Sequence, residues 1–369
     1  MTKTIGTTFK IINIIVVLLY LSACLNPFLP AGKFWMIAIL GLVFPLLAAL
    51  VAVFFLIWLA FRSKWCFLSL AAVLLSWQQI SVMAGYNGNK KFNYNKPAET
   101  IRIFSWNVSS WSETNKNQNH PVEFRPLMLD LIKQQQADVI CLQEFWDIEY
   151  GHDHYSILQI FKEMGYPHHY FVKSYLDKKN QKTGVAIISK YPITDTAKFY
   201  FGDEHFSEHL IYADIQFNNQ KIRFFTTHLQ SVRFDNTEYT ALRKIKRTDE
   251  SGLKDSRTIV HKLKHAYSYR GAEADLVKQK IQESPYPVLI CGDFNDVSNS
   301  YTYFTIKGDL QDAFLKKGRG LGRTFQYLSP TLRIDYILAD KKFKVEQYNR
   351  PKVPYSDHYP IVSDLSTAQ

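Results

Sequence analysis

The chain has 369 residues, of which 47% are hydrophobic and 15% aromatic, so it can bury a sizeable core. Its formal net charge of +11 at pH 7 favours an anionic substrate or an anionic lipid surface. A protein whose basic surface serves only solubility would have the same net charge. The four cysteines show none of the close spacings that bind zinc, which excludes a zinc-finger type of protein.

Residues 1–85 contain no Asp or Glu and carry three apolar runs. The runs at 34–60 and 65–83 are long enough to cross a bilayer, whereas the run at 11–25 is marginal and includes Asn13. A soluble helical bundle is the alternative, but so long a stretch without an acidic residue argues against it. The sequence therefore predicts a transmembrane segment of three helices over residues 1–85, followed by a polar linker over 86–99.

The basic residues around these runs predict the orientation in the membrane. One side would carry Lys3, Lys10, Arg62 and Lys64, and the other Lys33, Lys90, Lys91 and Lys96. Because the loop between the second and third runs is short and basic, it favours a cytoplasmic amino terminus, with the domain that follows on the extracytoplasmic side. Residues 21–24, Leu-Ser-Ala-Cys, also resemble a bacterial lipoprotein cleavage box, an alternative that leaves the domain on the same side.

Beyond residue 99, short apolar runs alternate with amphipathic stretches. Strands are expected at 101–108, 137–142, 184–189, 211–217, 222–227, 288–291, 324–328, 332–338, 343–347 and 361–365. Helices are expected at 121–136, 155–164 and 255–283, and Asn218-Asn219 is expected to form a hairpin turn. Strands occur both as neighbours and with helices between them, which fits two packed sheets flanked by helices.

Polar side chains gather where the expected buried strands begin or end. These residues are Asn107, Glu144, His228, Asp293, Asn295, Asp335, Asp357 and His358. Each buried polar group costs desolvation unless something pairs it, and a hard divalent cation would pair several of them. Oxygen ligands without cysteine indicate magnesium, manganese or calcium rather than zinc.

Six short blocks in this region resemble the endonuclease/exonuclease/phosphatase superfamily in their order and spacing. They are Ser-Trp-Asn at 105–107, Leu-Gln-Glu at 142–144, Thr-His-Leu at 227–229, Gly-Asp-Phe-Asn at 292–295, Arg-Ile-Asp-Tyr at 333–336 and Ser-Asp-His at 356–358. The resemblance implies an α+β fold over residues 100–369, a four-layer α/β/β/α sandwich of two mixed β-sheets. It also implies metal-dependent hydrolysis of phosphate esters.

The resemblance assigns the metal ligands and the base. Glu144 would be the main ligand of Mg²⁺ or Mn²⁺, with Asn107 and Asp357 close to the metal or the phosphate. Asp293 would orient and deprotonate the attacking water, although an Asp of ordinary pKa is a poor base unless its site raises that pKa. Asn295 would hold a phosphoryl oxygen.

The resemblance also assigns the two histidines. His358, oriented by Asp335, would donate to the phosphate, and His228 would act on the leaving-group side. Abasic-site enzymes of the superfamily usually have Asp-Gly where Ser109-Ser110 stand, so this resemblance does not extend to abasic-site specificity.

The sequence thus predicts a membrane-anchored phosphodiesterase that acts on nucleic acid or on a phospholipid headgroup, contacts lipid through its amino-terminal helices and needs no obligate protein partner. A run of Lys and Arg between 243 and 264 would suit either substrate, although a solvated face is its default interpretation. The alternative is an inactive membrane-tethered domain that binds a polyanion or a partner protein. That alternative predicts the loss of a metal ligand or of the base, and none is missing.

Overall fold

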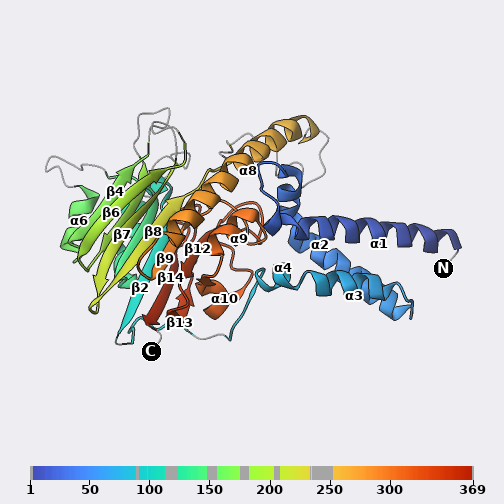
Figure 1. The fold of residues 1–369 in the computed structure, drawn as a ribbon, viewed down its shortest axis with the longest axis horizontal. Coiled ribbons are helices and arrows are strands. Elements are labelled where there is room, and N and C mark those ends of the chain that lie inside the picture. Colours follow the sequence, from blue (N-terminus) through green and yellow to red (C-terminus); the bar gives the residue numbers. More distant parts are fainter. Residues whose placement is uncertain are drawn as a thin grey trace. The chain divides into compact units, whose positions relative to one another are not determined.

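A computed structural model describes residues 3–88, 91–97, 99–112, 124–147, 156–174, 183–202, 208–232, 234 and 252–367 (Figure 1). The chain divides into two compact units. The first consists of Met1–Ala84, Ser231–Asp275 and Asp296–Ile306, and the second of Gly85–Gln230, Leu276–Asn295 and Lys307–Gln369. The basic residues expected at 243–247 lie outside the described part of the chain.

The second unit contains two six-stranded sheets, in the orders β10-β12-β9-β8-β7-β6 and β13-β14-β2-β3-β5-β4. The first sheet comprises β6 (Ile193–Tyr200), β7 (His209–Phe217), β8 (Gln220–His228), β9 (Val288–Asp293), β10 (Gln311–Asp312) and β12 (Asp335–Ala339). The second comprises β2 (Thr100–Asn107), β3 (Val139–Phe145), β4 (His168–Lys173), β5 (Gly184–Ser189), β13 (Phe343–Asn349) and β14 (Ile361–Thr367). Both sheets are mixed, because β8 pairs with β9 and β2 with β3 in parallel.

The sheets share one apolar core and are flanked by helices. Ile103 and Ile187 of one sheet cluster with Phe224 and Leu289 of the other. The opposite face of the β2 sheet is covered by α5 (Phe124–Gln135) and α6 (Ile157–Glu163). Further short elements are η2 (Ser109–Ser112) and α10 (Ala313–Lys317). The expected α+β fold with two mixed sheets is therefore confirmed.

Two of the expected strands differ from the prediction, and β4 and β6 were not predicted. The stretch 324–328 forms no strand, only a single bridge between Phe325 and His358. The strand expected from residue 332 begins at Asp335 instead. By contrast, Asn218 and Asn219 both have positive φ, 44° and 63°, and close the predicted hairpin between β7 and β8.

Strand β9 is buried along its whole length, as predicted from its apolar sequence. Gly292 has a φ of +149°, and a Cβ there would lie 2.1 Å from the carbonyl oxygen of Thr227. Glycine therefore allows β8 and β9 to approach closely at the position where their last residues, His228 and Asp293, pair in register.

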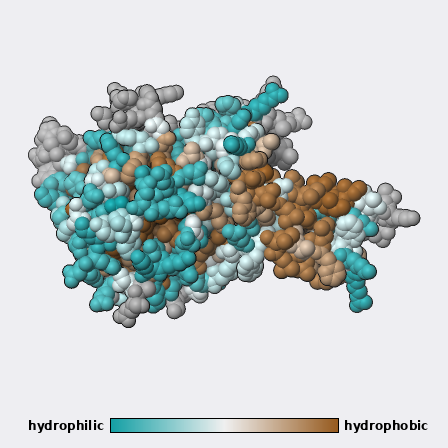
Figure 2. Space-filling view, viewed as in Figure 1, coloured by the Kyte–Doolittle hydropathy of each residue, from teal (hydrophilic) through white to brown (hydrophobic). Residues whose placement is uncertain are grey.

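The first unit contains the apolar helices α1 (Lys3–Cys24), α2 (Trp35–Ala60), α3 (Cys66–Leu75) and α4 (Trp77–Ser81), with the 3-10 turn η1 (Asn26–Phe28). Among the described residues, Gly6–Phe28 and Trp35–Ala60 are the helices long and apolar enough to cross a membrane. Large apolar side chains such as Leu46 and Leu75 are 61% and 75% exposed. Figure 2 shows apolar side chains covering the visible surface of these helices, which a water-soluble bundle would bury.

The prediction of three membrane-length helices is wrong for the third apolar run, which breaks at Ser76 into α3 and α4. The Ser76 hydroxyl donates to the carbonyl of Val73 at 2.9 Å and also bonds the hydroxyl of Tyr20 in α1. A serine that bonds the preceding turn in this way favours a bend. The two short helices nevertheless lie along α1. Ser69 of α3 donates to Asn13 at 3.3 Å, and Gln79 of α4 donates to the carbonyl of Cys24 at 2.9 Å.

The apolar helices are joined to the rest of the first unit by buried amides. The Asn26 amide donates to the carbonyl of Asn299 at 3.1 Å, and the Asn299 amide donates to the carbonyl of Ala23 at 3.3 Å. A Cβ on Gly41 would lie 2.2 Å from the Asn26 amide nitrogen, so only glycine leaves room for this contact. Tyr267 of α8 (Gly252–Gln282) is buried against the start of α2. Helix α9 (Tyr301–Lys307) follows Asn299.

The described part of the expected linker is bound to the second unit. Strand β1 (Gly85–Tyr86) pairs with β11 (Arg319–Gly320). The Asn87 amide donates to the carbonyls of Leu315 and Gly318 at 3.1 and 3.0 Å. Farther along, the guanidinium of Arg102 holds the carbonyls of residues 93 and 94.

Candidate active site

The polar residues at the strand ends meet at one rim of the two sheets. Asn107, His228 and Asp293 are the last residues of β2, β8 and β9. Strand β12 runs antiparallel to β9, so its first residue, Asp335, pairs with Asp293. The Asn107 amide donates to Asp293 Oδ2 at 3.0 Å, which joins the two sheets at this rim.

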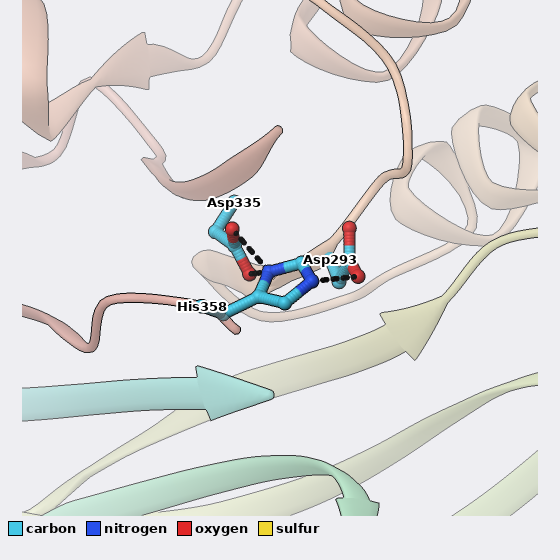
Figure 3. Close-up of side chains that lie close together, drawn as sticks. All are labelled: Asp293, Asp335 and His358. Carbon is cyan, nitrogen blue, oxygen red and sulfur yellow. Dashed lines mark hydrogen bonds and ion pairs between the residues drawn. The ribbon is translucent and has the colours of Figure 1, made fainter. Parts of the chain in front are cut away.

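His358 lies between two buried carboxylates, as Figure 3 shows. Its Nδ1 bonds Asp335 Oδ2 at 2.9 Å, and its Nε2 lies 3.6 Å from Asp293 Oδ2. Burial alone would lower the pKa of His358, but the charges of Asp335 and Asp293 outweigh burial and raise it well above its usual value. These carboxylates therefore favour the charged form of the imidazole, which Asp335 orients.

Asp293 is buried and contacts both histidines. Its Oδ2 lies 3.6 Å from His228 Nε2 as well as from His358 Nε2, and its Oδ1 accepts from the backbone N–H of Asn295 at 2.8 Å. Burial raises the pKa of Asp293, while the two imidazolium groups oppose this rise. A raised pKa makes this carboxylate a better base than an ordinary Asp.

His228 has a partner that the sequence analysis missed. Its Nδ1 lies 3.4 Å from Glu208 Oε2, while its Nε2 faces Asp293 and Glu144. Burial opposes the charged form, but Glu208, Asp293 and Glu144 together raise the pKa of His228 to about 10. Glu208 thus faces Nδ1 of His228 in the same way that Asp335 faces Nδ1 of His358.

Glu144 reaches the rim through a distortion of β3. The pairing of β3 with β5 shifts register between Leu142 and Phe145, and Glu144 has a φ of +49°. Such a bulge redirects a side chain from the regular alternation of a strand. Glu144 Oε1 accepts from the Asn107 amide at 3.2 Å and lies 3.7 Å from His228 Nε2.

Other residues of the six blocks hold this rim together. The Trp106 indole donates to the carbonyl of His358 at 2.8 Å, and the Ser356 hydroxyl donates to the carbonyl of Asn107 at 2.8 Å. The Gln143 amide donates to the Thr226 hydroxyl at 2.9 Å, a bond between the two sheets. These side chains position the loops that carry the charged groups.

Comparison with known families agrees with this geometry: residues 105–358 match the endonuclease/exonuclease/phosphatase family. The chain belongs to this family. Residues 6–83 match a domain of unknown function, DUF8431. None of the curated proteins compared with the chain matches it.

Solved structures of the endonuclease/exonuclease/phosphatase family share the fold at low identity. A family member from Beutenbergia cavernae has a TM-score of 0.54 and 16% identity, covering 73% of this chain and 72% of its own. The catalytic domain of human Nocturnin, with a bound sulfate anion, has a TM-score of 0.51 and 17% identity, covering 73% and 94%. A family protein from Leptotrichia buccalis has a TM-score of 0.50 and 18% identity, covering 72% and 99%.

The donors at the rim fit the divalent metal that enzymes of the endonuclease/exonuclease/phosphatase family use. Burial raises the pKa of Glu144 and the nearby charge of Asp357 raises it further, although His228 opposes both. A cation held by these two carboxylates would relieve their repulsion. Asp293, Asp335 and His358 also offer ligand atoms within 4.8 Å of one another. Because His358 Nδ1 already bonds Asp335, however, the geometry of this second cluster better fits an oriented imidazole.

The remaining predicted residues are placed as follows. Asn295 directs its amide nitrogen to the carbonyl of Leu229 at 2.9 Å and has a φ of +51°. Asp357 is half-buried and its Oδ1 accepts from the Ser356 hydroxyl at 3.2 Å. The structure therefore brings Asp357 close to Glu144, and it gives the Asn295 amide nitrogen a bond within the protein.

Replacing Glu208 by Gln is expected to lower the pKa of His228, because the carboxylate that stabilises its charged form is lost. Loss of a charge-assisted hydrogen bond should reduce the rate of any reaction that needs this imidazolium about tenfold or more. NMR titration of the His228 ring, alongside steady-state rates, would measure both effects. Glu346→Gln, which changes a carboxylate bonded to Lys344 and Ser366, is the control. A rate loss without a change in the His228 titration would contradict the role given to Glu208.

Proposed function

We propose that this chain is a membrane-bound, divalent-metal-dependent phosphodiesterase. The observation that carries the proposal is the position of Asp293 Oδ2, 3.6 Å from the Nε2 atoms of both His228 and His358. A buried base between two imidazolium groups suits attack by water on an anionic phosphate, because the base takes a proton while the cations face the phosphoryl oxygens. The sulfate bound by the Nocturnin catalytic domain, a tetrahedral anion like phosphate, supports this choice.

In the proposed reaction, Asp293 removes a proton from a water molecule as that water attacks phosphorus. The ester P–O bond on the opposite side breaks, and the departing oxygen receives a proton from the imidazolium of His228. His358, held by Asp335, donates to a phosphoryl oxygen. Glu144, Asn107 and Asp357 would hold the metal, which when bound supplies positive charge for the phosphoryl and leaving-group oxygens. Asn295 positions Asp293 through its backbone N–H.

We propose that the chain crosses the membrane three times, with α1 and α2 as the membrane-length helices and the shorter α3 and α4 together forming the third pass. The contacts of the two shorter helices support a third pass, since Cys66 of α3 packs near Phe54 of α2 and Gln79 of α4 bonds the end of α1. The basic residues Arg62 and Lys64 between the second and third passes favour a cytoplasmic location for that loop. The catalytic unit would then be extracytoplasmic. A reporter enzyme fused after Gln369 should be active only outside the cytoplasm, and cytoplasmic activity would reverse this orientation.

Removal of divalent metal is expected to abolish hydrolysis, and Mg²⁺ or Mn²⁺ should restore it. The test uses the full chain in detergent, because the apolar helices pack against Asn299 and Tyr267 of the same unit. Substrates would include a chromogenic phosphodiester, single-stranded DNA, RNA, sphingomyelin and phosphoinositides. Equal rates with and without EDTA would refute the metal dependence. Binding of these polyanions without turnover would instead favour the inactive tethered domain.

A further inference from the structure

Two arginines beside the catalytic histidine have no carboxylate partner among the described residues. Arg323 donates to the Tyr359 hydroxyl at 3.4 Å, and Arg350 donates to the carbonyl of Arg323. Their guanidinium carbons lie 5.8 and 5.2 Å from the centre of the Tyr359 ring. Each guanidinium has five N–H groups, so most of these donors have no acceptor among the residues that the structure describes.

This arrangement differs from that of the other arginines in the second unit that are mostly or fully buried. Arg102 pairs with Asp364, Arg223 with Asp214 and Arg333 with Asp312, at distances of 2.7, 2.7 and 2.6 Å. Burial lowers the pKa of Arg350; Tyr348 and Tyr359 oppose this effect, whereas the like charge of Arg323 adds to it. Two partly buried cations without a counter-charge are costly, and a bound anion would offset that cost.

The arginine pair contacts Tyr359, the residue that follows His358. Phe325 forms a β-bridge with His358, and its ring lies 5.1 Å from the imidazole. The Tyr359 N–H donates to the carbonyl of Thr324 at 2.8 Å. Arg323 therefore lies two residues before Phe325, the bridge partner of His358. This separation is about 7 Å along an extended chain.

The loop that carries Arg323 is itself basic and rich in glycine. Residues 316–323 read Lys-Lys-Gly-Arg-Gly-Leu-Gly-Arg, with four bases and no acid. Gly320 and Gly322 have φ of +74° and +67°. The loop is held in place by the pairing of Gly320 with Gly85.

We infer that Arg323 and Arg350 bind a second phosphate group of the substrate, distinct from the phosphate that is hydrolysed. This inference rests on the proposed phosphodiesterase function. Guanidinium groups match the oxygens of a phosphate with paired, charge-assisted hydrogen bonds. The second phosphate could belong to a soluble ester or to a lipid headgroup, and the two sources share this chemistry.

The first experiment measures phosphate binding without catalysis. Inorganic phosphate is titrated into the full chain in detergent with EDTA present, and the increase in Tm is recorded. We expect Arg323→Gln and Arg350→Gln each to reduce the apparent affinity about tenfold or more. Lys352→Gln removes the same charge at an exposed position two residues from Arg350 and should bind phosphate like the wild type.

One further variant and one stability measurement keep this test independent of folding. Arg350→Lys preserves the charge but not the planar fork, so it should bind more weakly than the wild type. Arg323→Gln removes only a long hydrogen bond and a ring contact, so its Tm without phosphate should change little. An equal phosphate response in wild type and in both Gln variants would overturn the inference.

The second experiment measures specificity with Mg²⁺ present. Thymidine 5′-(p-nitrophenyl phosphate) is compared with the same diester carrying a 3′-phosphate. The wild type should have a lower KM for the 3′-phosphorylated ester, and the Gln variants should lose this difference in KM between the two esters. If the second phosphate belongs to a lipid, vesicles with phosphatidic acid should compete with the 3′-phosphorylated ester through the same arginines. Vesicles of phosphatidylcholine alone are the comparison.

The outcomes separate the two proposals. Hydrolysis of neither ester, together with arginine-dependent phosphate binding, would refute the phosphodiesterase and retain the phosphate site. Hydrolysis of both esters with no wild-type preference, or with a preference that survives in the Gln variants, would overturn the phosphate site alone.

Discussion

Asp293→Asn is expected to lower kcat by about 10²–10⁴-fold, the usual contribution of a general base. The replacement keeps the size and planarity of the side chain and removes its basic oxygen. Because burial already raises the pKa of Asp293, losing the charge should leave Tm equal or slightly higher. The measurement is kcat on a phosphodiester with saturating Mg²⁺, together with thermal unfolding of the same samples.

The matched control is Asp309→Asn, because Asp309 is fully exposed and its pairing with Lys341 is a surface contact. This variant should keep wild-type kcat. His358→Ala should also lose activity, since it removes the imidazole that Asp335 orients. Wild-type kcat in Asp293→Asn would contradict the assignment of Asp293 as the base. A large fall in the Tm of this variant would show instead that the carboxylate stabilises the fold.

Arg102→Met is expected to destabilise the second unit by about 3–5 kcal/mol, the usual cost of breaking a buried ion pair. Arg102 and Asp364 are both fully buried, and two N–H···O bonds of 2.7 and 2.9 Å join them. The remaining donors bond the carbonyls of Asn93, Tyr94 and Gln135 at 2.9, 2.9 and 3.0 Å. Substitution leaves the Asp364 carboxylate with Gln347 as its remaining side-chain donor, at 2.7 Å.

Urea unfolding followed by tryptophan fluorescence would measure this loss. Lys344→Met breaks the exposed pair with Glu346 at 2.8 Å and should cost at most about 1 kcal/mol. Arg102→Met combined with Asp364→Leu should recover part of the stability, because no uncompensated charge remains. A double variant less stable than Arg102→Met would mean that the other bonds of the guanidinium matter more than the pair.

Local patterns in the sequence predicted the elements whose structure depends on residues close together in the chain. The buried strand β9 follows from its continuous apolar run, and the hairpin follows from two asparagines that tolerate positive φ. Strands β4 and β6 were missed because each is the last strand of its sheet. Such edge strands are only partly buried, so their sequences lack regular apolar alternation.

The parts of the site that were missed depend on contacts distant in sequence. Glu208 meets His228 because a hairpin separates them, and no spacing rule predicts that pair. The bulge that redirects Glu144 is a property of β3 against β5 rather than of the Leu-Gln-Glu block. The break at Ser76 likewise involves Tyr20, fifty-six positions earlier.

The buried amide contacts of the first unit bear on how this chain could be re-engineered. Asn299, which bonds the end of α1, follows Asn295 by four positions. An unrelated signal anchor grafted in place of residues 1–84 would leave both Asn299 and Tyr267 without their neighbours. The apolar helices are therefore not an interchangeable module for the other segments of the first unit, Ser231–Asp275 and Asp296–Ile306.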